Sequence, residues 1–190
     1  MIAGQKDFLT IPPFHDAHIH FMIDGHPATL DDCLSISAEY FSKGIASLVD
    51  MGHKSGLGMK FKKVSDRKIP MTIKIRSAGL ALNKKGGYGG FLGKGVSGKE
   101  EIRSAVQTLA ETGADFIKII NSGIVSLQDE KPVIEGGFSG DEWRVIQEEA
   151  EAHGLPVCCH ANSDRAIRQA VDFGVSSVEH GFFISRELLF

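Results

Sequence analysis

Runs of strand-forming residues alternate with runs of helical periodicity along the chain, and this alternation limits the fold more than any other feature. Apolar, strand-like runs occur six times, at residues 14–20, 45–51, 71–76, 115–120, 156–160 and 176–180. Runs with apolar residues three or four apart lie between them, at 30–43, 58–64, 99–112, 141–153 and 163–173. Strands that alternate with helices at this spacing form βα units around a parallel sheet.

Six βα units predict an α/β fold of the (β/α)8-barrel type that lacks two units, because a closed barrel has eight in about 250 residues. We expect residues 1–190 to form one partial barrel, with a further helix opening at 185–190. An open array of this kind exposes sheet edges on its first and sixth strands. We therefore expect the chain to be poorly soluble, to form a homo-oligomer, or to belong to a larger fold.

The composition excludes several classes of protein. The chain is 42% hydrophobic with a net charge of −3, which is typical of a soluble globular protein and gives no reason to expect nucleic acid as a partner. No apolar run approaches the 18 residues or more of a membrane span, and the N-terminus lacks the apolar core of a signal peptide. Three cysteines, an odd number, do not form a disulfide framework, so we expect a cytoplasmic protein.

Unusual polar residues stand where the predicted strands end. His18 and His20 end the first strand, Lys118 lies in the fourth, His160 ends the fifth and His180 ends the sixth. In a parallel barrel the carboxyl ends of the strands form the catalytic face. A His-x-His pair alone is as consistent with ordinary loop histidines as with a metal site, but side chains two apart share a face and can hold one divalent ion.

Lys118 is surrounded in sequence by Phe116, Ile117, Ile119 and Ile120. Burial of an ammonium ion is costly, so this lysine is expected to be neutral, paired or chemically altered. The alternative is a lysine on an edge strand that reaches water along its own stem.

These motifs, in this order, resemble the amidohydrolase superfamily, in particular its imidazolonepropionase-like and prolidase-like members. The resemblance rests on His-x-His, on Lys118 in Gly-Ala-Asp-Phe-Ile-Lys-Ile, on His160 in Cys-Cys-His-Ala-Asn and on His180 in Val-Glu-His-Gly. It implies a TIM-barrel hydrolase in which His18 and His20 bind one divalent metal and His160 and His180 bind a second. It also implies that Lys118, carboxylated on its amine, bridges two Zn²⁺ ions. Lys118 and His180 are the expected catalytic residues.

The activity implied is hydrolysis of a carbon–nitrogen bond in a small amide, cyclic amide or dipeptide by a metal-activated hydroxide. The sequence departs from the family pattern in two ways. The strand-eight aspartate that ligates metal and shuttles the proton has no counterpart, and of the flanking β-sandwich only residues 1–12 could be a remnant. The alternative is a non-catalytic, truncated barrel that binds metal weakly or acts through association with another chain.

Several further residues carry weaker expectations. His53 and Tyr88 are candidates for the substrate pocket, and the segment 80–98, which holds seven glycines, is expected to be a loop. The strand parity that turns His180 inward turns Glu179 away from the site. Asn162 and Asp164 are expected to cap the helix that opens at residue 163.

Overall fold

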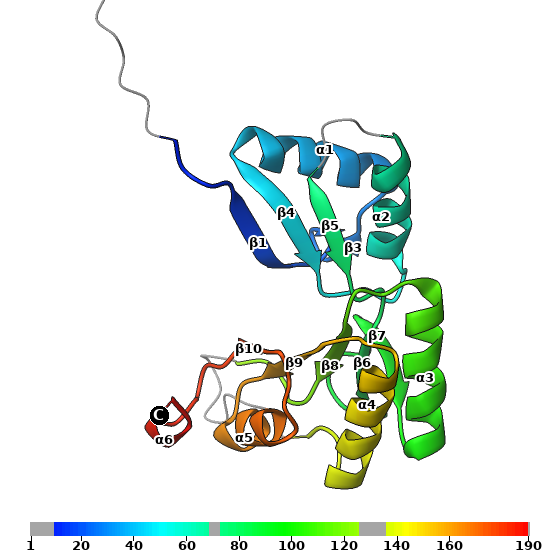
Figure 1. Ribbon diagram of the computed structural model, residues 1–190, viewed down its shortest axis with the longest axis vertical. Coiled ribbons are helices and arrows are strands. Elements are labelled where there is room, and N and C mark those ends of the chain that lie inside the picture. The colour runs from blue at the N-terminus through cyan, green and yellow to red at the C-terminus, as the bar shows by residue number, and fades with distance from the viewer. Residues whose placement is uncertain (1–9, 69–72, 126–135, 190) are drawn as a thin grey trace, which may run out of the picture.

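The computed structural model describes residues 10–68, 73–125 and 136–189, which form two parallel sheets with helices packed outside them (Figure 1). The first sheet has the order β1-β4-β5, and its strands are parallel. Its strands are β1 Phe14–Ile19, β4 Ile45–Asp50 and β5 Lys74–Ser77, and its helices are α1 Leu30–Ser42 and α2 Leu57–Lys68. A short hairpin, β2 Met22–Ile23 and β3 His26–Pro27, follows β1.

The second sheet has the order β10-β9-β8-β6-β7 and is also parallel. Its strands are β6 Ala81–Lys84, β7 Gly93–Val96, β8 Ile117–Ile120, β9 Val157–Ala161 and β10 Ser177–His180. Its helices are α3 Lys99–Thr112, α4 Gly140–Ala152, α5 Asp164–Asp172 and the short α6 Arg186–Leu189. Apart from β7, the strands follow one another in the order in which they occur in the chain, as in a barrel.

The expectation of a loop over 80–98 is wrong, because this segment contains two strands. Gly79, with φ +72°, bends the chain after β5, and the chain resumes as β6, which pairs with β8. Strand β7 then pairs with β6, and a side chain at Gly93 would lie 1.6 Å from the Ala81 carbonyl oxygen. Glycine has low strand propensity, yet here it permits a backbone approach that no other residue allows.

The core follows the parity of the strands. Val157 and Cys159 pack outward with the helices, in a cluster that includes Trp143 of α4. Cys158 points to the other face, where it packs beside Phe116 and Met51. Alternate residues of β9 therefore face the helices and the inside of the barrel.

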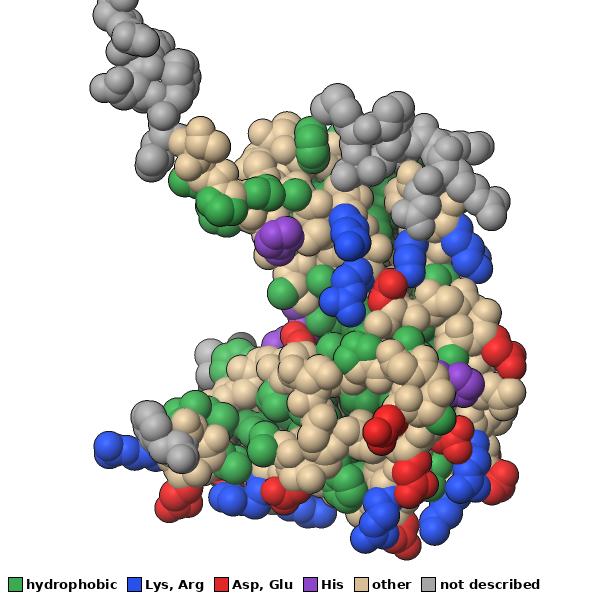
Figure 2. All heavy atoms as spheres, in the orientation of Figure 1, with side chains coloured by type: hydrophobic (Ala, Val, Ile, Leu, Met, Phe, Trp, Pro, Cys, Tyr) green, Lys and Arg blue, Asp and Glu red, His purple; other side chains and the backbone are tan. Residues whose placement is uncertain are grey.

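The two outer strands of the barrel order, β1 and β10, are unpaired on their far sides among the described residues, as expected for the first and sixth strands. Figure 2 shows a hollow between the part of the molecule built on the first sheet and the part built on the second. Phe14 on β1 and Phe182 after β10 are 60% and 65% exposed. No helix in the described ranges is long and apolar enough to cross a membrane. Residues 1–9, which include most of the predicted sandwich remnant, lie outside the described residues.

Glu142 joins three elements and gives a test of the fold. Its carboxylate accepts hydrogen bonds from Lys84 Nζ, the Gly98 backbone N–H at 2.8 Å and Ser139 in the capping box of α4. Burial would raise its pKa, but these donors outweigh burial and hold the pKa at about 2, below the usual 4.5. The stabilisation is therefore complete above pH 4.5 and is lost as the pH falls towards 2.

We expect Glu142→Gln to reduce the free energy of unfolding at pH 7 by about 2 kcal/mol, because charge-assisted hydrogen bonds are lost. Urea denaturation measures this, with the exposed Glu148→Gln on the same helix as control, expected within about 0.5 kcal/mol of wild type. The difference between wild type and Glu142→Gln should shrink below pH 4.5. A constant difference down to pH 2 would contradict the assignment.

Candidate metal centre

Four histidines and one lysine from four strands converge at the carboxyl ends of the strands. The ring centroids of His18 and His20 lie 5.4 Å apart, those of His18 and His180 4.8 Å apart, and those of His160 and His180 4.7 Å apart. Burial is the main cause that lowers the pKa of His20, His160 and His180, and the nearby charge of Lys118 lowers each pKa further. The structure thus brings together all five residues that the sequence selects as ligands.

Lys118 is 1% exposed, and among the described residues no partner lies within hydrogen-bond distance of its Nζ atom. Burial lowers its pKa to about 8, and the carboxylate of Glu179 partly opposes this effect. A buried amine without a partner is destabilising as an ammonium ion. This is the unsatisfied group that carboxylation or a bound cation would explain.

His18 and His20 each have one ring nitrogen in a hydrogen bond, which leaves the other nitrogen available to a metal. His20 Nδ1 lies 2.8 Å from the Gly52 carbonyl oxygen, so this nitrogen donates and Nε2 keeps its lone pair. His18 Nδ1 lies 2.5 Å from Glu179 Oε2, which leaves His18 Nε2 in the same state. Burial lowers the pKa of His20 to about 4, so it is a neutral imidazole at pH 7.

His160 has the opposite arrangement, because its Nε2 atom, not Nδ1, makes the hydrogen bond. Its Nε2 lies 3.0 Å from the Gly123 carbonyl oxygen, which leaves Nδ1 as the nitrogen available to a metal. Asn162 Nδ2 donates to the same carbonyl at 3.0 Å and lies 3.1 Å from His160 Nε2. The expectation that Asn162 caps the next helix is therefore wrong, because Ser163 is the N-cap of α5 and Asn162 turns towards His160. Asp164 also differs, since its Oδ1 accepts from the Ser185 backbone N–H.

Glu179 belongs to the site, although the alternation of side chains along β10 predicts that it points away. His180 has φ +72°, a left-handed conformation that is uncommon for a residue other than glycine. The turn of the backbone at this point lets the His180 ring contact His18 and His160 although Glu179, the residue before it, also faces inward. The expectation that Glu179 points away is wrong for this reason.

The residue types fit a divalent metal, because neutral imidazoles with free nitrogens surround a buried lysine that lacks a partner. Within the described residues, no three or more His, Cys, Asp or Glu side chains are placed so that they could hold a metal ion as they stand. The donors are thus gathered around one another, but they do not form a closed coordination shell.

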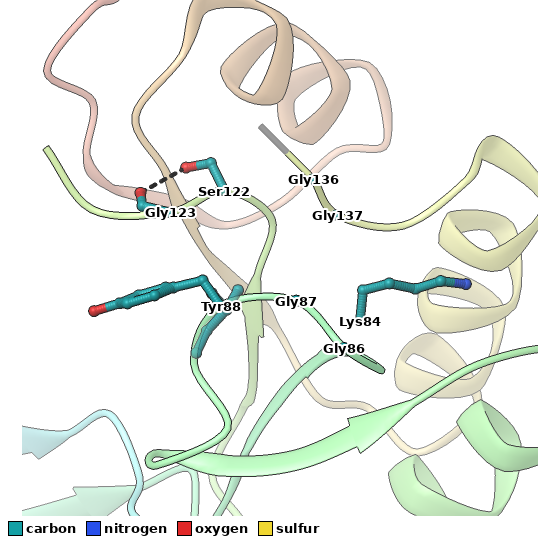
Figure 3. A pocket seen from close by; sticks show the side chains of 9 residues that line it. Lys84, Gly86, Gly87, Tyr88, Ser122, Gly123, Gly136 and Gly137 are labelled. Carbon is teal, nitrogen blue, oxygen red and sulfur yellow. Dashed lines mark hydrogen bonds between the residues drawn. The ribbon is translucent and has the colours of Figure 1, made fainter. Parts of the chain in front are cut away.

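Two hollows adjoin the site. A cavity of about 370 Å³ lies over β6 and β8, and Figure 3 shows the side chains of Tyr88 and Lys84 extending in opposite directions. Tyr88 also lies 6.0 Å from the His160 ring, so it is placed as a substrate-pocket residue would be. A smaller hollow of about 240 Å³, lined mainly by apolar atoms of Ile124, Val125 and Phe182, touches His160 and His180. His53 is 4% exposed and its Nδ1 lies 2.9 Å from Ser55 Oγ; its role in the substrate pocket stays a prediction.

Parallel βα units with polar residues at the carboxyl ends of their strands define an α/β protein of the barrel type. The sequence profile of the Amidohydrolase family matches residues 9–188, and the chain belongs to that family. It is 27% identical to ochratoxinase of Aspergillus niger over 216 residues, which cover 94% of this chain and 44% of that enzyme.

Solved structures show the same relationship. A prolidase complexed with N-methylphosphonate-L-proline matches with a TM-score of 0.74 and 29% identity, over 92% of this chain and 48% of the prolidase. An amidohydrolase crystal structure matches with a TM-score of 0.77 and 27% identity, over 98% of this chain and 54% of that one. The chain therefore spans about half the length of the relatives that it matches, which is consistent with a partial barrel.

Proposed function

We propose that the protein is a metal-dependent hydrolase of carbon–nitrogen bonds in a small amide, cyclic amide or dipeptide. The observation that carries the proposal is the buried Nζ atom of Lys118, without a partner among the described residues, beside four inward histidines. Relatives named ochratoxinase and prolidase support hydrolysis of an amide or peptide bond. The cytoplasmic location remains a prediction from the sequence.

In this proposal His18 and His20 hold one Zn²⁺ ion, His160 and His180 hold the other, and carboxylated Lys118 bridges them. When bound, the metals would supply a water of lowered pKa and polarise the scissile carbonyl. The chain's own groups prepare the ligands: the Gly52 carbonyl orients His20, and the Gly123 carbonyl orients His160. Carboxylation turns the buried amine of Lys118 into an anionic oxygen ligand and thereby removes the cost of a buried cation.

The substrate would lie over the same end of the strands. His180 is exposed, contacts both neighbouring histidines and borders the apolar hollow, so it can touch a bound substrate as well as a metal. Tyr88 forms part of the wall of the larger cavity, and its ring lies beside that of His160. These positions support their roles as catalytic and substrate-contacting residues respectively.

A second candidate function is a non-catalytic partial barrel that binds metal weakly or acts by association, including with a copy of itself. Two observations favour it: the donors do not form a closed shell in the described residues, and apolar side chains are exposed beside β1 and β10. The two candidates differ in whether a form with all eight βα units turns over substrate.

The test compares the 190-residue chain with a form that carries all eight units, each purified with zinc and bicarbonate. We expect the short chain to hold fewer than two metals, to leave Lys118 unmodified and to lack turnover, because a closed zinc site needs more ligands than it supplies. We expect the longer form to hold two metals, to show a carbon dioxide increment by native mass spectrometry, and to lose hydrolysis of simple amides and dipeptides on chelation. Chelator-resistant turnover would refute metal dependence, and turnover by the short chain would show the missing units dispensable.

A further inference from the structure

The carboxylate of Glu179 connects the two open edges of the barrel. Its Oε2 lies 2.5 Å from His18 Nδ1, across the space between β10 and β1, and its Oε1 accepts from Ser177 Oγ at 2.8 Å. Its side chain is 14% exposed, so the contact is largely withdrawn from water. The hydrogen bond joins residues 161 positions apart in the sequence.

This contact decides which nitrogen of His18 carries the proton. A neutral imidazole has one N–H and one lone pair, and the partner of one nitrogen fixes the state of the other. A carboxylate accepts only, so it selects the tautomer with the proton on Nδ1.

We propose that Glu179 is a positioning residue that keeps the proton of His18 on Nδ1 and aims His18 Nε2 at the metal. The inference rests on the proposed function. It adds a positioning residue, which is not itself a ligand, to the five ligands that the sequence predicts. Partners of this kind orient a ligand histidine and raise its basicity. The left-handed backbone at His180 makes the arrangement feasible, since it lets consecutive residues of β10 serve the same site.

A purely structural link between β1 and β10 would make a different demand. Such a link requires only that the two side chains stay in contact, whichever nitrogen of His18 carries the proton. The proposed role requires a particular tautomer and a dependence of metal affinity on it. The tautomer can be observed without any metal, by long-range proton–nitrogen NMR of the labelled 190-residue chain.

The experiment measures the His18 tautomer in the metal-free chain and the zinc affinity of the same chain by titration calorimetry. In wild type we expect the proton on Nδ1. In Glu179→Ala we expect it to move to Nε2 and the zinc affinity to fall by about 10- to 100-fold, the usual effect of losing such a partner. Glu187→Ala on α6, an exposed glutamate near the same end of the chain, is the control and should match wild type in both readouts.

Glu179→Gln has the same shape and guards against misfolding of the alanine variant, as judged by circular dichroism. Its amide oxygen can still accept from Nδ1, so we expect the tautomer to persist and zinc affinity to fall by only about fivefold. Three outcomes overturn this inference alone. They are a His18 proton on Nε2 in the wild type, an unchanged tautomer or zinc affinity in a folded Glu179→Ala, and an unchanged zinc affinity in Glu179→Gln. Unchanged zinc binding in His18→Ala instead overturns the proposed function and this inference with it.

Discussion

His160→Ala is expected to remove metal and abolish hydrolysis in a form that carries all eight units, with turnover reduced by roughly a thousandfold or more. Loss of a hydrogen-bond partner to a ligand histidine typically costs about 10- to 100-fold, and loss of the ligand itself should cost more. His160 is buried, and its Nε2 is committed to the Gly123 carbonyl, so the substitution takes the available Nδ1 atom from the site.

Metal content by elemental analysis and initial rates on an amide substrate measure the effect of His160→Ala. His153→Ala is the matched control, because His153 is exposed at the C-cap of α4 and should leave both quantities at wild-type values. Equal metal content and rate in His160→Ala and wild type would remove His160 from the ligand set.

Lys118→Met is expected to raise the stability of the chain while it abolishes activity. Methionine has a similar length and no charge, so it fills the same space without a buried amine. The pKa of Lys118 falls from 10.5 to about 8 on burial, and each unit corresponds to about 1.4 kcal/mol, so removal of the amine should stabilise the 190-residue chain by about 3 kcal/mol at pH 7. In the eight-unit form the same substitution should abolish turnover, because the bridging ligand is lost.

Urea denaturation of the metal-free chain and rates of the longer form measure the two effects of Lys118→Met. Lys74→Met is a suitable comparison, since Lys74 lies on β5 and is exposed, and its replacement should change neither quantity greatly. A destabilised Lys118→Met chain would mean that the amine has a partner in solution, and would contradict the argument from its burial.

The elements that the sequence predicts well are those with strong local signals. The helix predicted over 99–112 is the one observed, because its apolar face has helical spacing and Gly113 ends it in the left-handed conformation. The partial barrel and its strand order follow from the same alternation. Strands β6 and β7 could not be predicted, since alanine, asparagine and lysine in β6 and glycine in β7 are all depleted in strands. Gly93 pairs for a reason that only the neighbouring backbone reveals.

The candidate site divides in the same way. His18, His20, Lys118, His160 and His180 stand out because each polar residue ends or interrupts an apolar run. Glu179 and Asn162 do not, because their directions depend on the backbone at His180 and on the loop at Gly123. Parity holds only while a strand stays regular, and a single positive φ is enough to break it.

The hydrogen bond between His18 and Glu179 also has a consequence for when the site can assemble. At about 5 to 20 residues per second, the 161 residues between them take on the order of 10 to 30 s to synthesise. During that interval β1, β4 and β5 can pair and bury their own core, while the imidazoles of His18 in β1 and His20 just after it have no partner from the second sheet. A metal ion that meets the growing chain in this period finds two donors only, so stable capture has to wait until the sixth barrel strand has left the ribosome.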